Sequence, residues 1–351
     1  MKKTMAIIGF GGMGGWHYNN ITTRIPELTV KGVLDIRQER LEKARELNLH
    51  IYESLDEILA DEELDFVSII APNDTHKEYA IACLRGGKHV VCEKPVTMNA
   101  AELEEIMVVA KETGKLFTIH HNRRLDKDYK IIKKIIEEDI IGQPYFIENR
   151  VQGSRQSLHG WRGHKPNGGG MVFDWGVHLL DQMLMLIDSK VVSVDAHLQY
   201  LFSNEVDDNI KIFLRFENKV SAVLEMSTNC LINTDRWHLS CIGGTAVIHD
   251  WECNGKIVQL RQDADMQWED DIVYTEAGPT RTMAPRPSYT TIEKPLPEVE
   301  TDWTDFYKNV MAAIDGVESP DVLPHEALRV MKVIDLIFES DVVGHGIACY
   351  I

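Results

Sequence analysis

The sequence has no long apolar run and no excess of basic residues. No uninterrupted apolar stretch approaches the roughly 20 residues that cross a bilayer as a helix, so we expect no membrane span. Lys and Arg number 37 against 55 Asp and Glu, which gives a formal charge of −18. A surface this acidic repels phosphate backbones and anionic lipids, which argues against nucleic acids and membrane surfaces as partners.

Cysteine is scarce, and the sequence contains neither an internal repeat nor a low-complexity tract. The six cysteines form no C-x-x-C pair and show no repeated spacing. Most of them lie in or beside apolar runs, where a free thiol behaves as a small hydrophobic group. We therefore predict a cytoplasmic location. The opening stretch, MKKTMAIIGFGG, has a short apolar run that breaks into glycines, so it predicts a first strand rather than a signal peptide.

The first third of the chain contains short apolar runs that alternate with helical patterns. The runs are MAIIGF, LTVKGVLD, LDFVSIIA, KHVVCE and KLFTIH. Amphipathic stretches lie between them, and one of these extends from a possible cap at Asn99 to Gly114. The alternation predicts an α/β fold, a parallel sheet with helices on both faces. The length of 351 residues suits two domains, and we assign the first, a Rossmann dinucleotide-binding domain, to residues 1–122.

The turn after the first strand has the G-x-G-x-x-G pattern between a strand and a helix, which is the context in which this pattern binds dinucleotides. It comprises Gly9, Phe10, Gly11, Gly12, Met13 and Gly14. Its glycines allow a tight turn, close approach to a pyrophosphate and close helix packing. Asp35 lies about 20 residues further on, where a carboxylate binds the adenosine ribose, and this favours NAD over NADP. Arg37 could soften that preference by pairing with a 2′-phosphate.

A second glycine cluster opens the stretch GGGMVFDWGVHLLDQ, which begins at Gly168. If the apolar run is helical, Asp174 and His178 lie on one face with Asp181, because steps of three and four residues bring side chains together. A carboxylate and an imidazole would then point at a common spot. The alternative is that Asp174 caps a helix and that His178 is a half-buried structural histidine.

Several motifs occur together in the order and spacing of a known family. They are the glycine turn, APNDTH at 71–76, GGKHVVCEKP at 86–95, Trp161-Arg162, and the stretch that begins at Gly168. Across nearly the whole chain they resemble the glucose–fructose oxidoreductase / inositol dehydrogenase / rhizopine-catabolism (Gfo/Idh/MocA) family. The resemblance implies a cis bond between Lys94 and Pro95. It also implies that the glycine turn and Asp35 bind NAD, or NADP, together with Pro72, Asn73, His76, Glu93, Lys94, Trp161 and Arg162.

The resemblance further implies that Lys94, Asp174 and His178 form the catalytic group, and elementary chemistry agrees. Oxidation of a secondary alcohol needs a base, and His178 has an ordinary pKa of about 6.5. Lys94 can donate a hydrogen bond to the developing alkoxide, while Asp174 orients the imidazole or a substrate hydroxyl. Asp174 and His178 have no evident third partner for a metal ion, so we predict no metal.

From residue 123 onward the pattern changes, and we assign a second α/β domain to residues 123–351. Apolar residues alternate in NIKIFLRF and VSAVLEM, and HLSCIGG, TAVIHDW and KIVQLRQ follow with short turns. Such alternation predicts a large, open, mostly antiparallel sheet with one covered face. The uncovered face would suit a homo-oligomer, which the resemblance also implies.

Further residues are candidate contacts for the substrate. Asn122 and Arg123 follow a strand at the carboxyl end of the first sheet, where ligands bind, although a surface pair is the alternative. His159 and His164 flank Trp161 and are candidates of the same kind. The long segment 263–301 borders the substrate or a neighbouring subunit, or else is a solvated insertion. Its candidate residues are Trp268, Tyr274, Arg281, Arg286 and Tyr289.

Three functions are compatible with these features. The first is an NAD-dependent oxidoreductase that oxidises a ring hydroxyl of a sugar, a glycoside or an inositol. The second is a glycoside-processing enzyme that recycles its NAD through oxidation, elimination and reduction. The third is a sugar sensor that binds NAD without turnover, and the intact group of Lys94, Asp174 and His178 argues against it.

Overall fold

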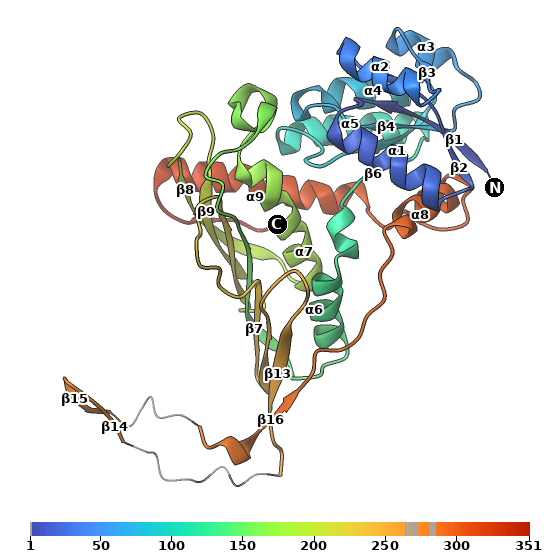
Figure 1. Ribbon diagram of the computed structural model, residues 1–351. Helices are drawn as coiled ribbons and strands as arrows, with labels where there is room; N and C mark the ends of the chain where they lie inside the picture. Colours follow the sequence, from blue (N-terminus) through green and yellow to red (C-terminus); the bar gives the residue numbers. More distant parts are fainter. Residues whose placement is uncertain (1, 264, 266, 268–271, 281–285) are drawn as a thin grey trace.

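The computed structural model describes residues 2–263, 265, 267, 272–280 and 286–351. It contains two large sheets flanked by helices, one built from residues 3–119 and the other from residues 144–348 (Figure 1). Trp268 and Arg281, two candidates of the long segment, lie outside the described residues. In the described part of the chain, no helix is both long and apolar enough to cross a membrane.

The first sheet has six strands in the order β3-β2-β1-β4-β5-β6, and all neighbours are parallel. Its strands are β1 (Lys3–Ile8), β2 (Leu28–Leu34), β3 (His50–Ile51), β4 (Phe66–Ile69), β5 (His89–Cys92) and β6 (Phe117–Ile119). Its helices are α1 (Gly12–Arg24), α2 (Gln38–Glu46), α3 (Leu55–Ala60), α4 (His76–Arg85) and α5 (Ala100–Thr113). All four residues of β4 are buried, as expected for a central parallel strand with helices on both faces. The predicted α/β fold is confirmed.

The ends of helix α5 show how local sequence sets an element's bounds. The side chain of Asn99 accepts a hydrogen bond from the backbone nitrogen of Glu102 at 2.9 Å, and so satisfies a free donor of the first turn. Gly114 follows the last turn with a φ of 65°, a left-handed conformation that glycine adopts without a steric penalty. Both ends lie where the sequence predicted them.

The second sheet has nine strands in the order β16-β13-β12-β11-β7-β10-β9-β8-β17. They are β7 (Pro144–Gln152), β8 (Val191–Gln199), β9 (Asn209–Phe216), β10 (Ser221–Ser227), β11 (Trp237–Cys241), β12 (Gly244–Ile248), β13 (Gly255–Leu260), β16 (Thr291–Lys294) and β17 (Ile347–Ala348). Strands β7 and β10 are parallel, whereas the other neighbours are antiparallel. The prediction of a mostly antiparallel sheet is confirmed.

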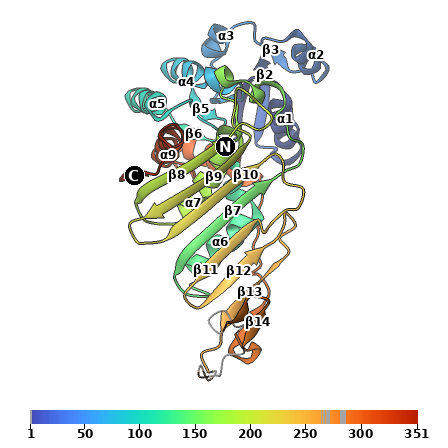
Figure 2. The same ribbon diagram turned by 90° about the vertical axis from the view of Figure 1, so that its left-hand side faces the viewer.

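One face of this sheet is covered by helices α6 (Lys127–Glu137), α7 (Val177–Leu186) and α9 (Pro324–Val343). Figure 2 shows the opposite face toward the viewer, with α6 and α7 behind the strands. Strand β9 follows this division, because Ile212 and Leu214 are buried whereas Lys211 and Phe213 are exposed. The use of the open face as a contact between subunits stays a prediction.

A short hairpin of β14 (Val273–Thr275) and β15 (Gly278–Thr280) projects from the body of the molecule (Figure 1). It belongs to the long segment that the sequence singled out. Tyr274 in the hairpin and Tyr289 beyond it are both more than half exposed. Neither side chain lines the cavity described below.

Helix α8 (Thr304–Ile314) returns from the second half of the sequence to the first sheet. Lys3 Nζ lies 2.8 Å from a carboxylate oxygen of Asp315, directly after this helix. Tyr307 is fully buried, and its ring lies 6.3 Å from that of Phe66 on β4. The domain boundary at residue 122 stays a prediction, and a cut at that single point would separate α8 from the sheet it covers.

Candidate active site

A cavity of about 810 Å³ lies at the carboxyl ends of β1, β2, β4 and β5, facing helix α7 and the loop before it. Parallel sheets bind ligands at this edge. Sixteen of the predicted site residues line the cavity: Gly9, Gly11, Gly12, Met13, Asp35, Arg37, Pro72, Asn73, Glu93, Lys94, Asn122, Arg123, Trp161, Arg162, Asp174 and His178. Three other predicted residues, Phe10, Gly14 and His76, are not part of the lining.

The glycines of the first turn divide into two kinds. Gly9 has a φ of +95°, and a Cβ there would lie 2.4 Å from the carbonyl oxygen of Ile70. A Cβ on Gly14 would lie 2.4 Å from the carbonyl oxygen of Gly9. In contrast, a Cβ on Gly12 would meet nothing within 4 Å, because this residue faces open space at the start of helix α1. Two glycines therefore allow the turn to pack, while Gly12 leaves the backbone bare at a helix N-terminus, a kind of position that favours anions.

Asp35 is tied to this turn. Its carboxylate accepts hydrogen bonds from the backbone nitrogen of Phe10 at 2.7 Å and from that of Arg37 at 2.9 Å. Phe10 thus contributes through its backbone, since its side chain is buried in the core. The side chain of Arg37 is exposed and lies 3.6 Å from Glu39. Arg40, which the sequence analysis missed, donates to Asp35 at 3.1 Å and lines the cavity.

His76 and Asn73 connect the walls of the cavity. The two ring nitrogens of His76 lie 2.9 Å from the carbonyl oxygens of Ala71 and Pro95, so this buried side chain joins the loops after β4 and β5. Asn73 donates through Nδ2 to the carbonyl oxygen of Gly168 at 2.9 Å. His76 therefore supports the cavity from behind, whereas Asn73 joins the two halves of the chain.

Lys94 and Asp174 form the polar centre of the cavity. Lys94 Nζ lies 2.7 Å from the carbonyl oxygen of Asp174 and 3.4 Å from its carboxylate. Arg162 Nε donates to the same carboxylate oxygen at 3.1 Å. Burial lowers the pKa of Lys94 even though Asp174 opposes it. Burial would raise the pKa of Asp174, but Lys94 and Arg162 outweigh it and hold this pKa below its usual value.

The backbone around these residues bears out one expectation and corrects another. The bond between Lys94 and Pro95 is cis, as the resemblance implied. Asp174, however, lies in a π-helical turn (Val172–Gly176), and helix α7 begins only at Val177. The wider π turn breaks the regular α-helical spacing on which the shared face of residues 174, 178 and 181 was predicted.

His178 is buried, and its Nδ1 is without a hydrogen-bond partner among the described residues. Its ring lies 5.8 Å from that of Trp175, while the carboxylate of Asp174 is engaged by Lys94 and Arg162. Burial, together with the charge of Lys94, holds the pKa of His178 well below its ordinary value. The imidazole is therefore neutral, and His178 lines the cavity.

Asp181, the third residue of the expected face, makes a different contact. Its carboxylate binds the guanidinium of Arg124 through two hydrogen bonds of 2.8 and 2.6 Å. Arg124 also contacts Glu326 at 2.8 Å, at the start of helix α9. Asp181 therefore joins helices in the interior and is not part of the cavity lining.

The three glycines from Gly168 to Gly170 are required by contacts within the protein. A Cβ on Gly168 would lie 2.6 Å from Met98 Sδ, and one on Gly169 would lie 2.3 Å from the carbonyl oxygen of Arg162. A Cβ on Gly170 would lie 2.3 Å from the carboxylate of Asp207. That carboxylate also accepts a hydrogen bond from Val172 at 2.8 Å, and the sequence analysis missed it.

Arg123 and an indole ring form the remaining wall. The guanidinium carbon of Arg123 lies 4.0 Å from the ring centre of Trp175, which also lines the cavity. Arg123 pairs with Asp126 at 2.9 Å, while its buried Nε is without a partner among the described residues. Asn122 lies beside it in the same lining, whereas His159 and His164 do not line the cavity.

Comparison with known proteins agrees with this geometry. Residues 3–121 match a family model described as an oxidoreductase family with an NAD-binding Rossmann fold, and residues 129–247 match the GFO/IDH/MocA C-terminal domain. The chain therefore belongs to the Gfo/Idh/MocA oxidoreductases, as its motifs predicted, and its first domain is an NAD-binding Rossmann fold.

Individual relatives extend the likeness over the whole chain. A crystal structure of an NAD-binding protein from Listeria innocua is 42% identical and superimposes with a TM-score of 0.95, covering 99% of each chain. The scyllo-inositol 2-dehydrogenase (NADP(+)) IolW of Bacillus subtilis is 26% identical over 96% of this chain and 93% of its own. The myo-inositol 2-dehydrogenase of Thermotoga maritima is 27% identical over 66% of this chain and 70% of its own.

Proposed function

We propose that this oxidoreductase oxidises a ring hydroxyl of a sugar, a glycoside or an inositol by hydride transfer to a nicotinamide cofactor. The observation that carries the proposal is that Lys94 and a neutral His178 line the same cavity as the glycine turn. The cofactor, when bound, accepts the hydride. Two relatives that are named inositol dehydrogenases support a cyclic polyol as the substrate class.

The residues divide the work between proton transfer and stabilisation of charge. His178 is the general base, because its neutral imidazole lines the cavity and can accept the proton of the substrate hydroxyl. The ammonium of Lys94 donates to the same oxygen as negative charge develops on it. Asp174 holds that ammonium in place, and Arg162 in turn holds the carboxylate of Asp174.

The cofactor end of the cavity fits an adenosine ribose and a diphosphate. The bare backbone at Gly12 fits the diphosphate, and the Asp35 carboxylate fits the ribose hydroxyls. We propose NAD as the preferred cofactor, with NADP as a second one because the Arg40 guanidinium lies beside Asp35. The IolW relative is named for NADP(+).

A panel of inositols, sugars and aryl glycosides tests the reaction. We expect reduced nicotinamide to accumulate with at least one cyclic polyol, and we expect Lys94→Ala to abolish that signal while NAD binding persists. Release of the aglycone without net reduction of NAD would instead favour the glycoside-processing reaction. Full activity of the Lys94→Ala enzyme would contradict the proposed mechanism.

A further inference from the structure

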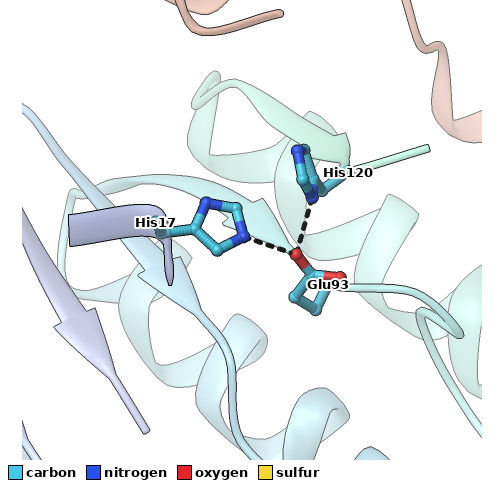
Figure 3. A group of neighbouring side chains, drawn as sticks. All are labelled: His17, Glu93 and His120. Carbon is cyan, nitrogen blue, oxygen red and sulfur yellow. Dashed lines mark hydrogen bonds and ion pairs between the residues drawn. The ribbon is translucent and has the colours of Figure 1, made fainter. Parts of the chain in front are cut away.

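Three buried polar side chains meet directly behind the cavity. His17 on α1, Glu93 after β5 and His120 after β6 point toward one another (Figure 3). Oε1 of Glu93 lies 2.8 Å from His17 Nε2 and 2.6 Å from His120 Nδ1. Each of the three residues is at most 7% exposed. Glu93 also lines the cavity, so this one carboxylate belongs both to the interior cluster and to the reaction space.

The protons in this cluster follow from its charges. Burial would raise the pKa of Glu93, but the two imidazoles outweigh it and hold that pKa well below its usual value, so Glu93 is an anion that accepts two hydrogen bonds. Burial lowers the pKa of His17, so its ring is neutral with the proton on Nε2. Its Nδ1 is then an acceptor, and the hydroxyl of Tyr307 lies 2.9 Å away. Burial raises the pKa of Tyr307, which therefore keeps its proton and donates it.

The chain of hydrogen bonds ends in the interior. Tyr307 belongs to helix α8, 290 residues from His17 in the sequence. Beyond it, Ser68 Oγ on β4 lies 3.4 Å from the phenol oxygen, and Ser68 is 1% exposed. A path that ends at a buried strand does not deliver protons to water. The cluster can therefore hold a group in place, but it cannot conduct protons.

Two histidines and a carboxylate are also a possible donor set for a metal ion, but their spacing favours hydrogen bonds. His17 Nε2 and His120 Nδ1 both contact the same oxygen of Glu93, each at the distance of a charge-assisted hydrogen bond. Ligand atoms that surround one zinc at about 2.0–2.1 Å in a tetrahedron stand further apart than this. We therefore treat the cluster as hydrogen-bonded.

The cluster acts on Lys94 in two ways. The second oxygen of Glu93, Oε2, accepts a hydrogen bond from the backbone nitrogen of Lys94 at 3.2 Å. After Asp174, the charge of Glu93 is also the largest influence that raises the pKa of the Lys94 ammonium against its burial. A Glu93 side chain that turned away would thus disturb both the place and the protonation of Lys94.

We propose that His17 and Tyr307 are positioning residues, which fix the Glu93 carboxylate and, through it, the ammonium of Lys94. The inference rests on the role proposed above for Lys94. Neither residue lines the cavity, so neither contacts the substrate or the cofactor. Their effect is exerted through Glu93 alone.

Tyr307→Phe tests the far end of the chain, and Tyr52→Phe is its matched control. Tyr52 is also buried, and its hydroxyl donates to a carboxylate oxygen of Asp61 at 2.6 Å, away from the cavity. We expect Tyr307→Phe to lower kcat by about 10-fold to 100-fold while KM for NAD stays unchanged. Tyr52→Phe should leave kcat unchanged even if both variants melt at a similar, lower temperature.

His17→Gln and His17→Leu test the middle of the chain. A glutamine amide can still donate to Glu93, whereas leucine cannot. We expect kcat to fall with His17→Leu and to be largely restored with His17→Gln. Nitrogen NMR of labelled histidines gives an independent measurement, and it should find His17 neutral with its proton on Nε2.

The outcomes separate this inference from the proposed function. If Lys94→Ala abolishes activity but Tyr307→Phe behaves like Tyr52→Phe, the positioning role is wrong and the reaction stands. If Lys94→Ala is fully active, the proposed reaction fails and the positioning role fails with it. If a chelator abolished the activity and zinc restored it, the cluster would be a metal site and the hydrogen-bonded arrangement would be wrong.

Discussion

The ammonium of Lys94 lies 2.7 Å from the carbonyl oxygen of Asp174 and 3.4 Å from its carboxylate, so one partly buried cation joins the nucleotide-binding sheet to the π-helical turn before α7. Asp174, which belongs to the second half of the chain, thus determines where the Lys94 side chain points. The charge on Asp174 also opposes the loss of the lysine proton that burial favours. The protonation of Lys94 is thus a property of both halves together.

The first prediction concerns the base. We expect His178→Ala to lower kcat by about 10²–10⁴-fold, because the substrate hydroxyl then loses the proposed acceptor of its proton. NAD binding, measured by titration calorimetry, should be unchanged. His164→Ala is the control, since His164 is exposed and pairs with Glu205 at 3.5 Å outside the cavity. Equal losses in the two variants would remove His178 from its assigned role.

The second prediction concerns the dependence of kcat on pH. Lys94 must be protonated to donate to the alkoxide, so kcat falls at high pH as this proton is lost. Asp174 raises the pKa of Lys94 and Arg162 lowers it. We therefore expect Asp174→Asn to move the alkaline limb of the kcat profile to lower pH, and Arg162→Gln to move it to higher pH. A shift of both variants in the same direction would show that another group controls this limb.

The third prediction concerns the choice of cofactor. The guanidinium of Arg40 contacts the Asp35 carboxylate, whereas that of Arg37 lies beside Glu39, so we expect Arg40 to pair with a 2′-phosphate. We expect Arg40→Gln to raise the preference for NAD over NADP by about tenfold in kcat/KM, the equivalent of about 1.4 kcal/mol. Arg37→Gln should change that ratio far less. A larger change of the ratio with Arg37→Gln would show that Arg37, as the sequence suggested, pairs with the 2′-phosphate.

The fourth prediction separates the two kinds of glycine in the first turn. Gly14→Ala should destabilise the protein by about 1–3 kcal/mol, because its Cβ would lie 2.4 Å from the carbonyl oxygen of Gly9. Gly12→Ala should leave the free energy of unfolding within about 0.5 kcal/mol of the wild type, because its Cβ meets nothing within 4 Å. It should nevertheless weaken NAD binding, since the methyl group would occupy the space of the diphosphate. Denaturant unfolding measures the first effect and calorimetry the second. Tight NAD binding by the Gly12→Ala variant would show that the diphosphate does not bind at Gly12.

The sequence predicted the features that depend on neighbours along the chain. The glycine turn, the Asn99 cap and the alternation in β9 are local patterns with a direct physical meaning, and the structure has each of them. The family motifs also predicted contacts between distant residues in the cavity, where Lys94 and Asp174 lie together although they are 80 residues apart. Without the ordered motifs, nothing in either local stretch would have paired these two residues.

The features that were missed depend on distant contacts. The π-helical turn at Asp174 changes a spacing that looks α-helical in the sequence, and the Asp207 carboxylate that meets Gly170 comes from another loop. The cluster of His17, Glu93 and His120 joins three elements, and none of these residues has a local partner that marks it. For Arg40 there was a usable signal, because it follows Arg37 by three residues at the start of a helix and so faces the same side.

The return of helix α8 to the first sheet has a consequence for synthesis. Tyr307 fills the interior beside β4 and completes the hydrogen bonds of His17, and Asp315 pairs with Lys3 at 2.8 Å. In a nascent chain that has emerged only as far as β6, His17 and Lys3 lack their partners Tyr307 and Asp315. The nucleotide-binding half therefore reaches its final structure only after α8 has left the ribosome.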